Sequence, residues 1–155
     1  MIHKTAEPLQ ELYESDETAW LDAMAERIGE GHLGDLDYPH LKEFLEDMAR
    51  SDRRKVESRL AILITHVLKW THQTDKRTPS WRGTITVQRH QLTRLLKSGV
   101  LRNHAEAVLA EIYSDAVELA ADETDLDEEA FPAECPWTLD QLLAAEVLSD
   151  DSTSE

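Results

Sequence analysis

The residues best suited to bind an anion fall in two predicted helices on either side of a short loop. His66 and Gln73 are seven residues apart, as are Arg82 and Arg89, so each pair lies on one face of its helix. Arginine makes bidentate contacts with carboxylates and phosphates, and tryptophan offers a stacking surface. A loop over residues 73–79 would make the two helices antiparallel neighbours. The candidate anion- or partner-binding residues are His66, Lys69, Trp70, Gln73, Arg77, Trp81, Arg82, Gln88 and Arg89.

A second interpretation makes the same residues structural. Their cations would pair with Glu111, Asp115 and Glu118 on a later helix, and their tryptophans would belong to the core. The segments on either side of residues 50–102 hold 29 acids, so internal partners are plentiful. On the sequence alone we favour this second interpretation, and both remain open.

The seven histidines do not have the spacing of a metal site. His66 and His72 are six residues apart, which puts them on different faces of a helix. The sequence has no His-Glu-x-x-His pair and no Cys-His cluster. We therefore predict no metal site.

The single cysteine, Cys135, is the one candidate nucleophile, and it would need a histidine as its base. It lies between Pro132 and Pro136, beside Phe131 and Trp137. This setting is more typical of a small buried thiol in an extended segment, here called the strap (residues 131–138). There is no glycine-rich phosphate loop, Gly-x-Ser-x-Gly motif or dinucleotide fingerprint. We assign no catalytic residue and no cofactor, although an enzyme with an unfamiliar site near His66 and Cys135 remains a third class.

Charge is strongly segregated along the chain. The segment from Arg50 to Arg102 holds 13 of the 16 Lys and Arg residues and three acids. Residues 103–155 hold 16 acids and no Lys or Arg, and the whole chain carries a net charge of −16. The overall charge opposes non-specific binding to nucleic acids and anionic lipids, so only an exposed basic face would attract phosphate.

Length and composition indicate one domain of 155 residues with 41% hydrophobic residues. The longest apolar run, Leu60–Ile64, is far shorter than the roughly 20 residues that a membrane-spanning helix needs. Residues 1–7 lack the apolar stretch of a signal peptide, and one cysteine cannot form an internal disulfide. We therefore expect a cytoplasmic protein with no membrane contact.

The apolar residues recur at helical spacing, which predicts an all-α protein. We expect a single-domain bundle of five or six helices over residues 1–148, with the extended, proline-containing strap near its C-terminal end and a disordered acidic tail over 149–155. After a lead-in turn around Leu9 and Leu12, the expected helix starts are Ser15 or Asp16, Asp37, Ser51 or Asp52, Ser80, Asn103 and Thr138. The helices from Asp37 and Ser51 are possibly continuous. The predicted core residues are Trp20, Leu60, Leu63, Val67, Trp70, Ile112 and Tyr113.

Short motifs along most of the chain resemble one known family. The most specific are His66-Val67-Leu68-Lys69-Trp70 and Ser80-Trp81-Arg82. The chain also has, in the order of the family, Leu12-Tyr13, Leu36-Asp37, Gln88-Arg89, Phe131-Pro132 and Cys135-Pro136-Trp137. From Leu12 to Leu143 the chain resembles the bacterial family known as domain of unknown function twenty-nine. The resemblance implies a small all-helical fold. It implies no catalytic residue, because the family has no established activity.

Two functions compete. The leading hypothesis is a non-enzymatic cytoplasmic interaction or regulatory protein, such as an adaptor, inhibitor or antitoxin-like partner. The alternative is a nucleic-acid-associated regulator that uses the basic segment 50–102. The sequence gives no oligomeric state.

Overall fold

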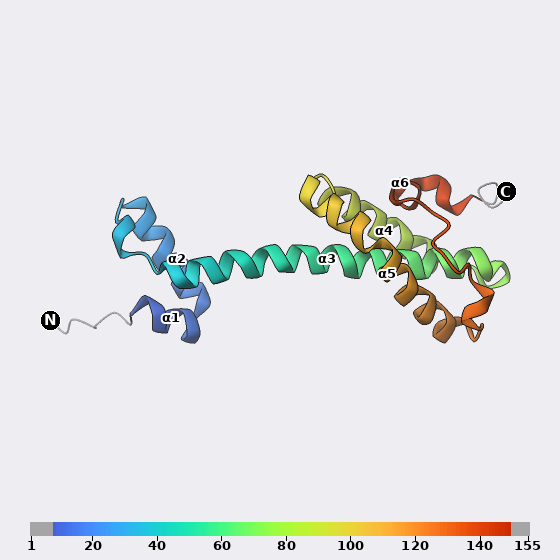
Figure 1. Ribbon diagram of the computed structural model, residues 1–155, viewed down its shortest axis with the longest axis horizontal. Coiled ribbons are helices and arrows are strands. Elements are labelled where there is room, and N and C mark those ends of the chain that lie inside the picture. Colours follow the sequence, from blue (N-terminus) through green and yellow to red (C-terminus); the bar gives the residue numbers. More distant parts are fainter. Residues whose placement is uncertain (1–7, 150–155) are drawn as a thin grey trace. The chain divides into compact units, whose positions relative to one another are not determined.

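The structure is a computed structural model that describes residues 8–149. In this range all regular secondary structure is helical, which confirms the all-α prediction (Figure 1). Of the predicted tail, residues 150–155 lie outside the described range. The six α-helices are α1 (Leu9–Ser15), α2 (Glu17–Gly29), α3 (Tyr38–His72), α4 (Pro79–Leu95), α5 (Gly99–Thr124) and α6 (Leu139–Leu143). Four 3-10 turns connect or follow them: η1 (Leu33–Asp35), η2 (Thr74–Lys76), η3 (Glu128–Ala130) and η4 (Ala145–Leu148).

The chain divides into two compact units, one ending at Arg50 and the other beginning at Ser51. The division falls inside α3, which contributes its first turns to one unit and its later turns to the other. Compactness alone does not show that a unit folds by itself. The single domain expected over residues 1–148 therefore stays a prediction.

The first unit is built around Trp20, which is fully buried with Met24 and Leu9. Asp16 caps α2 as predicted, because its carboxylate accepts a hydrogen bond from the Ala19 amide at 3.1 Å. Asp37 is also buried, and its carboxylate accepts from the Trp20 indole nitrogen at 3.2 Å. This bond satisfies two polar groups that would otherwise be costly to bury. The lead-in turn expected before Asp16 is a helix, α1.

The core of the second unit forms on one face of α3. Residues on this face from Val56 to Leu68 have no exposed surface, and Trp70 is 7% exposed. Helix α4 packs Ile85 and Leu92 into this core. Helix α5 adds Tyr113 together with three small residues that let it approach closely: Ala105, Ala116 and Ala120. Of the predicted core residues, Ile112 is half-buried and the others are buried.

Several predicted helix boundaries are wrong. Ser51 and Asp52 do not begin a helix, because α3 runs through them without interruption, which confirms the alternative that the helices from Asp37 and Ser51 are continuous. The hydroxyl of Thr78 caps α4 instead of Ser80, and Pro79 occupies the first helical position, where its missing N–H costs nothing. Ser98 caps α5 instead of Asn103, which lies in the second turn of that helix. At α6 the predicted capping box of Thr138 and Gln141 is confirmed.

Beyond α5 the chain returns along the core as the strap. Asp125 ends α5 in the left-handed conformation, with φ of 58°. Phe131 is buried, and the Tyr113 hydroxyl donates to the Pro132 carbonyl at 2.5 Å. Leu139 and Leu142 of α6 then join the same core. These contacts fasten the extended strap and the last helix to the second unit.

No helix within residues 8–149 has both the length and the apolar character required to cross a membrane.

Truncating Leu63 should strongly destabilise the protein, because this side chain has no exposed surface. We expect Leu63→Ala to lower the free energy of unfolding by about 2–5 kcal/mol. The matched control is Ile62→Ala on the adjacent residue, which is 38% exposed. Urea denaturation of both variants tests this, and equal losses for the two would contradict the assignment of the buried face of α3.

Candidate functional site

Five of the nine predicted site residues converge where α3 ends and α4 begins. The guanidinium carbons of Arg77 and Arg82 lie 4.7 and 5.3 Å from the centre of the Trp70 ring. The ammonium nitrogen of Lys69 lies 4.7 Å from the centre of the Trp81 ring. Such contacts are attractive because the faces of indole rings are electron-rich. We call Lys69, Trp70, Arg77, Trp81 and Arg82 the cation–indole cluster.

Most of the cation–indole cluster is committed to contacts within the fold. Lys69 is 8% exposed, and its ammonium lies 3.0 Å from the Glu123 carboxylate on α5. The Arg77 side chain donates to the Trp70 carbonyl at 2.8 Å, and the Trp70 indole donates to the Leu148 carbonyl at 3.3 Å. Arg82 is exposed beside a hollow of about 620 Å³. The cluster therefore ties the end of α3 to α4, to α5 and to the C-terminal part of the unit.

Among the other four predicted residues, the side chains of His66, Gln73 and Gln88 bond to groups outside this cluster. His66 bonds to the Ile62 carbonyl of its own helix at 2.8 Å, and the Gln73 amide donates to the Thr124 carbonyl at 3.3 Å. Gln88 accepts from Arg59 at 3.3 Å, and Arg89 is half-buried. The nine residues thus do not form one site.

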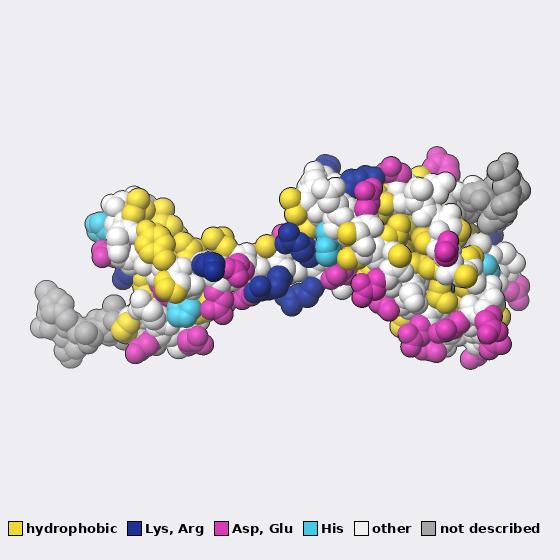
Figure 2. Space-filling view, viewed as in Figure 1, with side chains coloured by type: hydrophobic (Ala, Val, Ile, Leu, Met, Phe, Trp, Pro, Cys, Tyr) yellow, Lys and Arg dark blue, Asp and Glu magenta, His cyan; other side chains and the backbone are white. Residues whose placement is uncertain are grey.

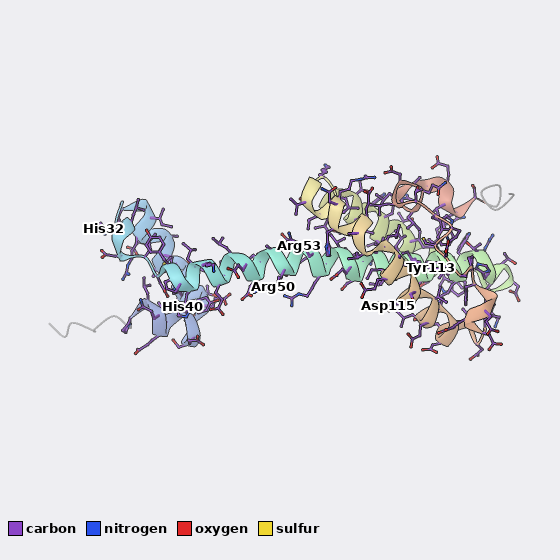
Figure 3. All side chains as sticks on the ribbon, viewed as in Figure 1. His32, His40, Arg50, Arg53, Tyr113 and Asp115 are labelled. Carbon is purple, nitrogen blue, oxygen red and sulfur yellow. The ribbon has the colours of Figure 1, made fainter. Side chains whose placement is uncertain are left out.

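The predicted internal neutralisation by α5 is wrong for the residues that we named. In the described part of the chain, Glu111, Asp115 and Glu118 form no ion pair with a Lys or Arg. Lys69 instead pairs with Glu123 of α5, and Arg102 pairs with Glu106 and Asp140. The physical reason is the orientation of α5, which turns Ala116, Ala120 and Tyr113 to the core and leaves Asp115 exposed at the surface (Figure 3).

A basic hollow of about 360 Å³ lies on the outer face of α3. Figure 2 shows Lys and Arg side chains gathering on this stretch of the helix. Arg54 is exposed and forms no ion pair with a described carboxylate, whereas Arg59 bonds only to the neutral amide of Gln88. Lys55 lies 3.7 Å from Asp52. The residues that line the basic hollow are Ser51, Arg54, Lys55, Ser58, Arg59 and Ile62.

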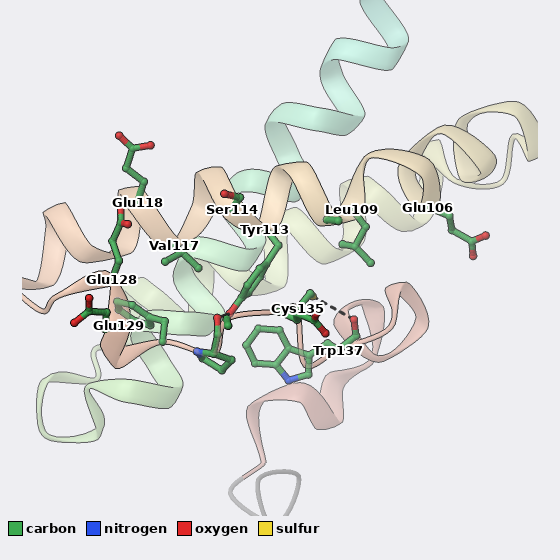
Figure 4. A pocket seen from close by; sticks show the side chains of 15 residues that line it. Glu106, Leu109, Tyr113, Ser114, Val117, Glu118, Glu128, Glu129, Cys135 and Trp137 are labelled. Carbon is green, nitrogen blue, oxygen red and sulfur yellow. Dashed lines mark hydrogen bonds between the residues drawn. The ribbon is translucent and has the colours of Figure 1, made fainter.

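A larger groove of about 1010 Å³ runs between α5 and the strap, and we call it the acidic groove (Figure 4). Its apolar lining includes Tyr113, Phe131 and Trp137. Five glutamates line it as well: Glu106, Glu118, Glu128, Glu129 and Glu134. The sequence did not predict this groove. Its walls are α5 and the strap, and the path that the strap takes past α5 cannot be read from helical spacing. The available signal was a run of glutamates without basic residues after Asn103.

Cys135 and Tyr113 both lie in the acidic groove, and neither is prepared for nucleophilic chemistry. Burial raises the pKa of the Cys135 thiol, which donates to the Trp137 carbonyl at 3.3 Å. Burial, with a smaller contribution from Cys135, raises the pKa of Tyr113 to about 12. No described histidine bonds to the Cys135 sulfur. Both groups are therefore neutral at physiological pH, as the interpretation of Cys135 as a structural thiol requires.

The described histidines are likewise dispersed. Within residues 8–149, no group of three or more His, Cys, Asp or Glu side chains is arranged to hold a metal ion. His40 bonds to Asp37 in the first unit at 2.7 Å (Figure 3). His72 lies with its ring edge-on to Phe131, and burial lowers its pKa.

The raised pKa of Cys135 predicts slow alkylation. A thiol whose pKa is raised by burial has less thiolate at a given pH than the same thiol in the unfolded chain. Iodoacetamide should modify the native protein more slowly than the protein in guanidinium chloride at neutral pH, and the rate should keep rising at pH values where the unfolded thiol is fully ionised. A native rate that reaches its plateau at lower pH than the unfolded rate would contradict this.

Comparison with known proteins addresses the family and leaves the activity open. No curated protein and no solved structure matches the chain. A family model matches residues 12–148, which includes the whole range, Leu12 to Leu143, over which the motifs indicated a resemblance. The chain therefore belongs to the family described as Domain of unknown function DUF29.

Proposed function

We propose that this protein is a non-enzymatic cytoplasmic interaction protein, and that its basic hollow binds an acidic segment of a partner protein. One observation carries the proposal. Arg54 and Arg59 have no carboxylate partner among the described residues, although the chain holds twice as many acids as bases. Their positive charge is thus available to a ligand.

The chemistry of the basic hollow suits carboxylates. Arg54 and Ser58 are four residues apart, as are Lys55 and Arg59, so all four lie on adjacent rows of the same side of α3. A guanidinium fork matches a carboxylate bidentately, and the hydroxyls of Ser51 and Ser58 supply further donors. From Ser51 to Ile62 the helix rises roughly 17 Å, enough for about five residues of an extended peptide.

A nucleic acid is the alternative ligand, because the same cations would contact phosphates. Two features favour an acidic protein segment. The net charge of −16 repels a long polyanion at a distance, and the basic hollow is short, so that few phosphates would reach it. A short acidic segment suffers less of this repulsion than a duplex does.

Charge reversal in the basic hollow should weaken the binding of an acidic peptide. The probe is a fluorescein-labelled 15-residue peptide of alternating glutamate and serine, and the readout is fluorescence anisotropy at low and physiological salt. We expect Arg54→Glu to weaken binding at least about tenfold at low salt, since it replaces an attraction by a repulsion. The matched control is Lys76→Glu in η2, which is exposed and outside the basic hollow.

Two results would contradict the proposal. Equal weakening by Lys76→Glu would show a non-specific effect of net charge. Tighter binding of a 15-nucleotide RNA or a 15-base-pair DNA, with a steep salt dependence that Arg54→Glu reduces, would establish the nucleic-acid alternative instead. Melting temperatures of both variants confirm that the fold is retained.

A further inference from the structure

The acidic groove is apolar at its floor and acidic along its rim. Leu109, Val117 and Trp137 are half-buried there, and they lie beside Tyr113 (Figure 4). The rim carries the five glutamates, and neither Lys, Arg nor His lines the groove. An ordinary solvated surface carries charges of both signs, whereas this groove combines an apolar floor with negative charges alone.

Four of the rim carboxylates have no cation within the described structure. Glu118, Glu128, Glu129 and Glu134 form no ion pair with any residue of 8–149, whereas Glu106 lies 3.6 Å from Arg102. These carboxylates carry negative charge on one groove, and a partner with positive charge would complement it. The groove therefore attracts cations and repels anions.

The α5 wall has the surface relief that accepts another helix. Its apolar row is Leu109, Tyr113 and Val117 at four-residue spacing. The adjacent row is Glu106, Ala110, Ser114 and Glu118, with two small residues between two glutamates. Rows at this spacing form the ridges and grooves along which helices pack, and small residues let a second helix approach closely. The two glutamates are separated by roughly 18 Å along the axis.

The size of the groove agrees with a short helical segment. A helix about 10 Å in diameter with a pitch of 5.4 Å fills roughly 420 Å³ per turn. The volume of about 1010 Å³ is thus comparable with that of a short helical segment. The strap, with Phe131 and Trp137, supplies an aromatic wall opposite α5, and aromatic side chains are common anchors in interfaces.

We propose that the acidic groove binds a basic amphipathic helix of a partner protein. The apolar stripe of that helix would pack on the half-buried Leu109, Val117 and Trp137, with its Lys and Arg residues against the glutamate rim. The acidic groove is separate from the basic hollow, because the two have no lining residue in common. The protein would then hold one basic and one acidic partner segment at different places on its surface.

A pair of synthetic peptides tests the chemistry of the groove. The first is an 18-residue helix of leucine, alanine and lysine, with leucines at positions i, i+3, i+4 and i+7 and lysines flanking that stripe. The second has glutamate in place of every lysine. We expect the lysine peptide to bind in the micromolar range by anisotropy and the glutamate peptide to show no binding.

Matched charge variants locate the binding. We expect Glu118→Gln combined with Glu129→Gln to weaken the lysine peptide about tenfold. The control combines Glu111→Gln with Asp122→Asn, two exposed acids of α5 outside the groove, and changes the net charge equally. Ser114→Arg should abolish binding, because it places a long cationic side chain in the row between Glu106 and Glu118 and changes the sign of the field there.

Three outcomes would overturn this proposal. The first is that the lysine peptide does not bind the wild-type protein. The second is that the control pair of substitutions weakens binding as much as the groove pair, and the third is that the glutamate peptide binds as tightly as the lysine peptide. Sedimentation of the protein alone gives a further check. A concentration-dependent dimer that Ser114→Arg abolishes would assign the groove to a second copy of this chain instead.

Discussion

Burial of one face of α3 constrains the rest of the second unit. The residues on this face between Val56 and Leu68 are withdrawn from water, and each large aliphatic side chain among them contributes about 1.5–3 kcal/mol. Helices α4 and α5 cover this face with their own apolar residues. The strap and α6 add Phe131, Leu139 and Leu142 to the same core. Since a helix has one buried face, its charged residues are confined to the opposite side.

For this reason, the basic and acidic segments of the sequence form separate basic and acidic surfaces of the second unit. Arg54, Lys55 and Arg59 of α3 lie outward at the basic hollow, and Glu106 and Glu118 of α5 lie along the acidic groove. Lys69 and Arg102 are exceptions, and they bridge elements through Glu123 and Asp140. The remaining charges contribute little to folding where they are exposed, because water screens them. They are therefore available for the partner binding that we propose.

The sequence predicted those features that local chemistry determines. The apolar face of α3 followed from helical spacing, the cap at Thr138 followed from its capping box with Gln141, and the cap at Asp16 was one of the two neighbouring residues predicted. Two other caps were misplaced, because Thr78 competes with Ser80 and Ser98 with Asn103, and both members of each pair are good cap residues. Packing determines which member is used.

The candidate sites were harder to predict because they depend on tertiary contacts. The approach of Arg77 and Arg82 to Trp70 followed from a short connection between antiparallel helices. The acidic groove did not, since its second wall is a strap without periodic pattern whose path is set by the Tyr113–Pro132 bond and by the burial of Phe131. Which carboxylate meets which cation likewise depends on the rotation of α5 about its axis, and helical spacing leaves that rotation undetermined.

We infer that the charges of the basic hollow and the acidic groove serve binding and not folding. The most direct test is the unfolding free energy, by urea denaturation, of the combined variant Arg54→Gln, Glu118→Gln and Glu129→Gln. These three side chains have no ion-pair partner among the described residues, so we predict a free energy within about 0.5 kcal/mol of the wild-type value, or slightly above it. A loss of more than about 2 kcal/mol would show that these charges hold the fold together, and would contradict the account.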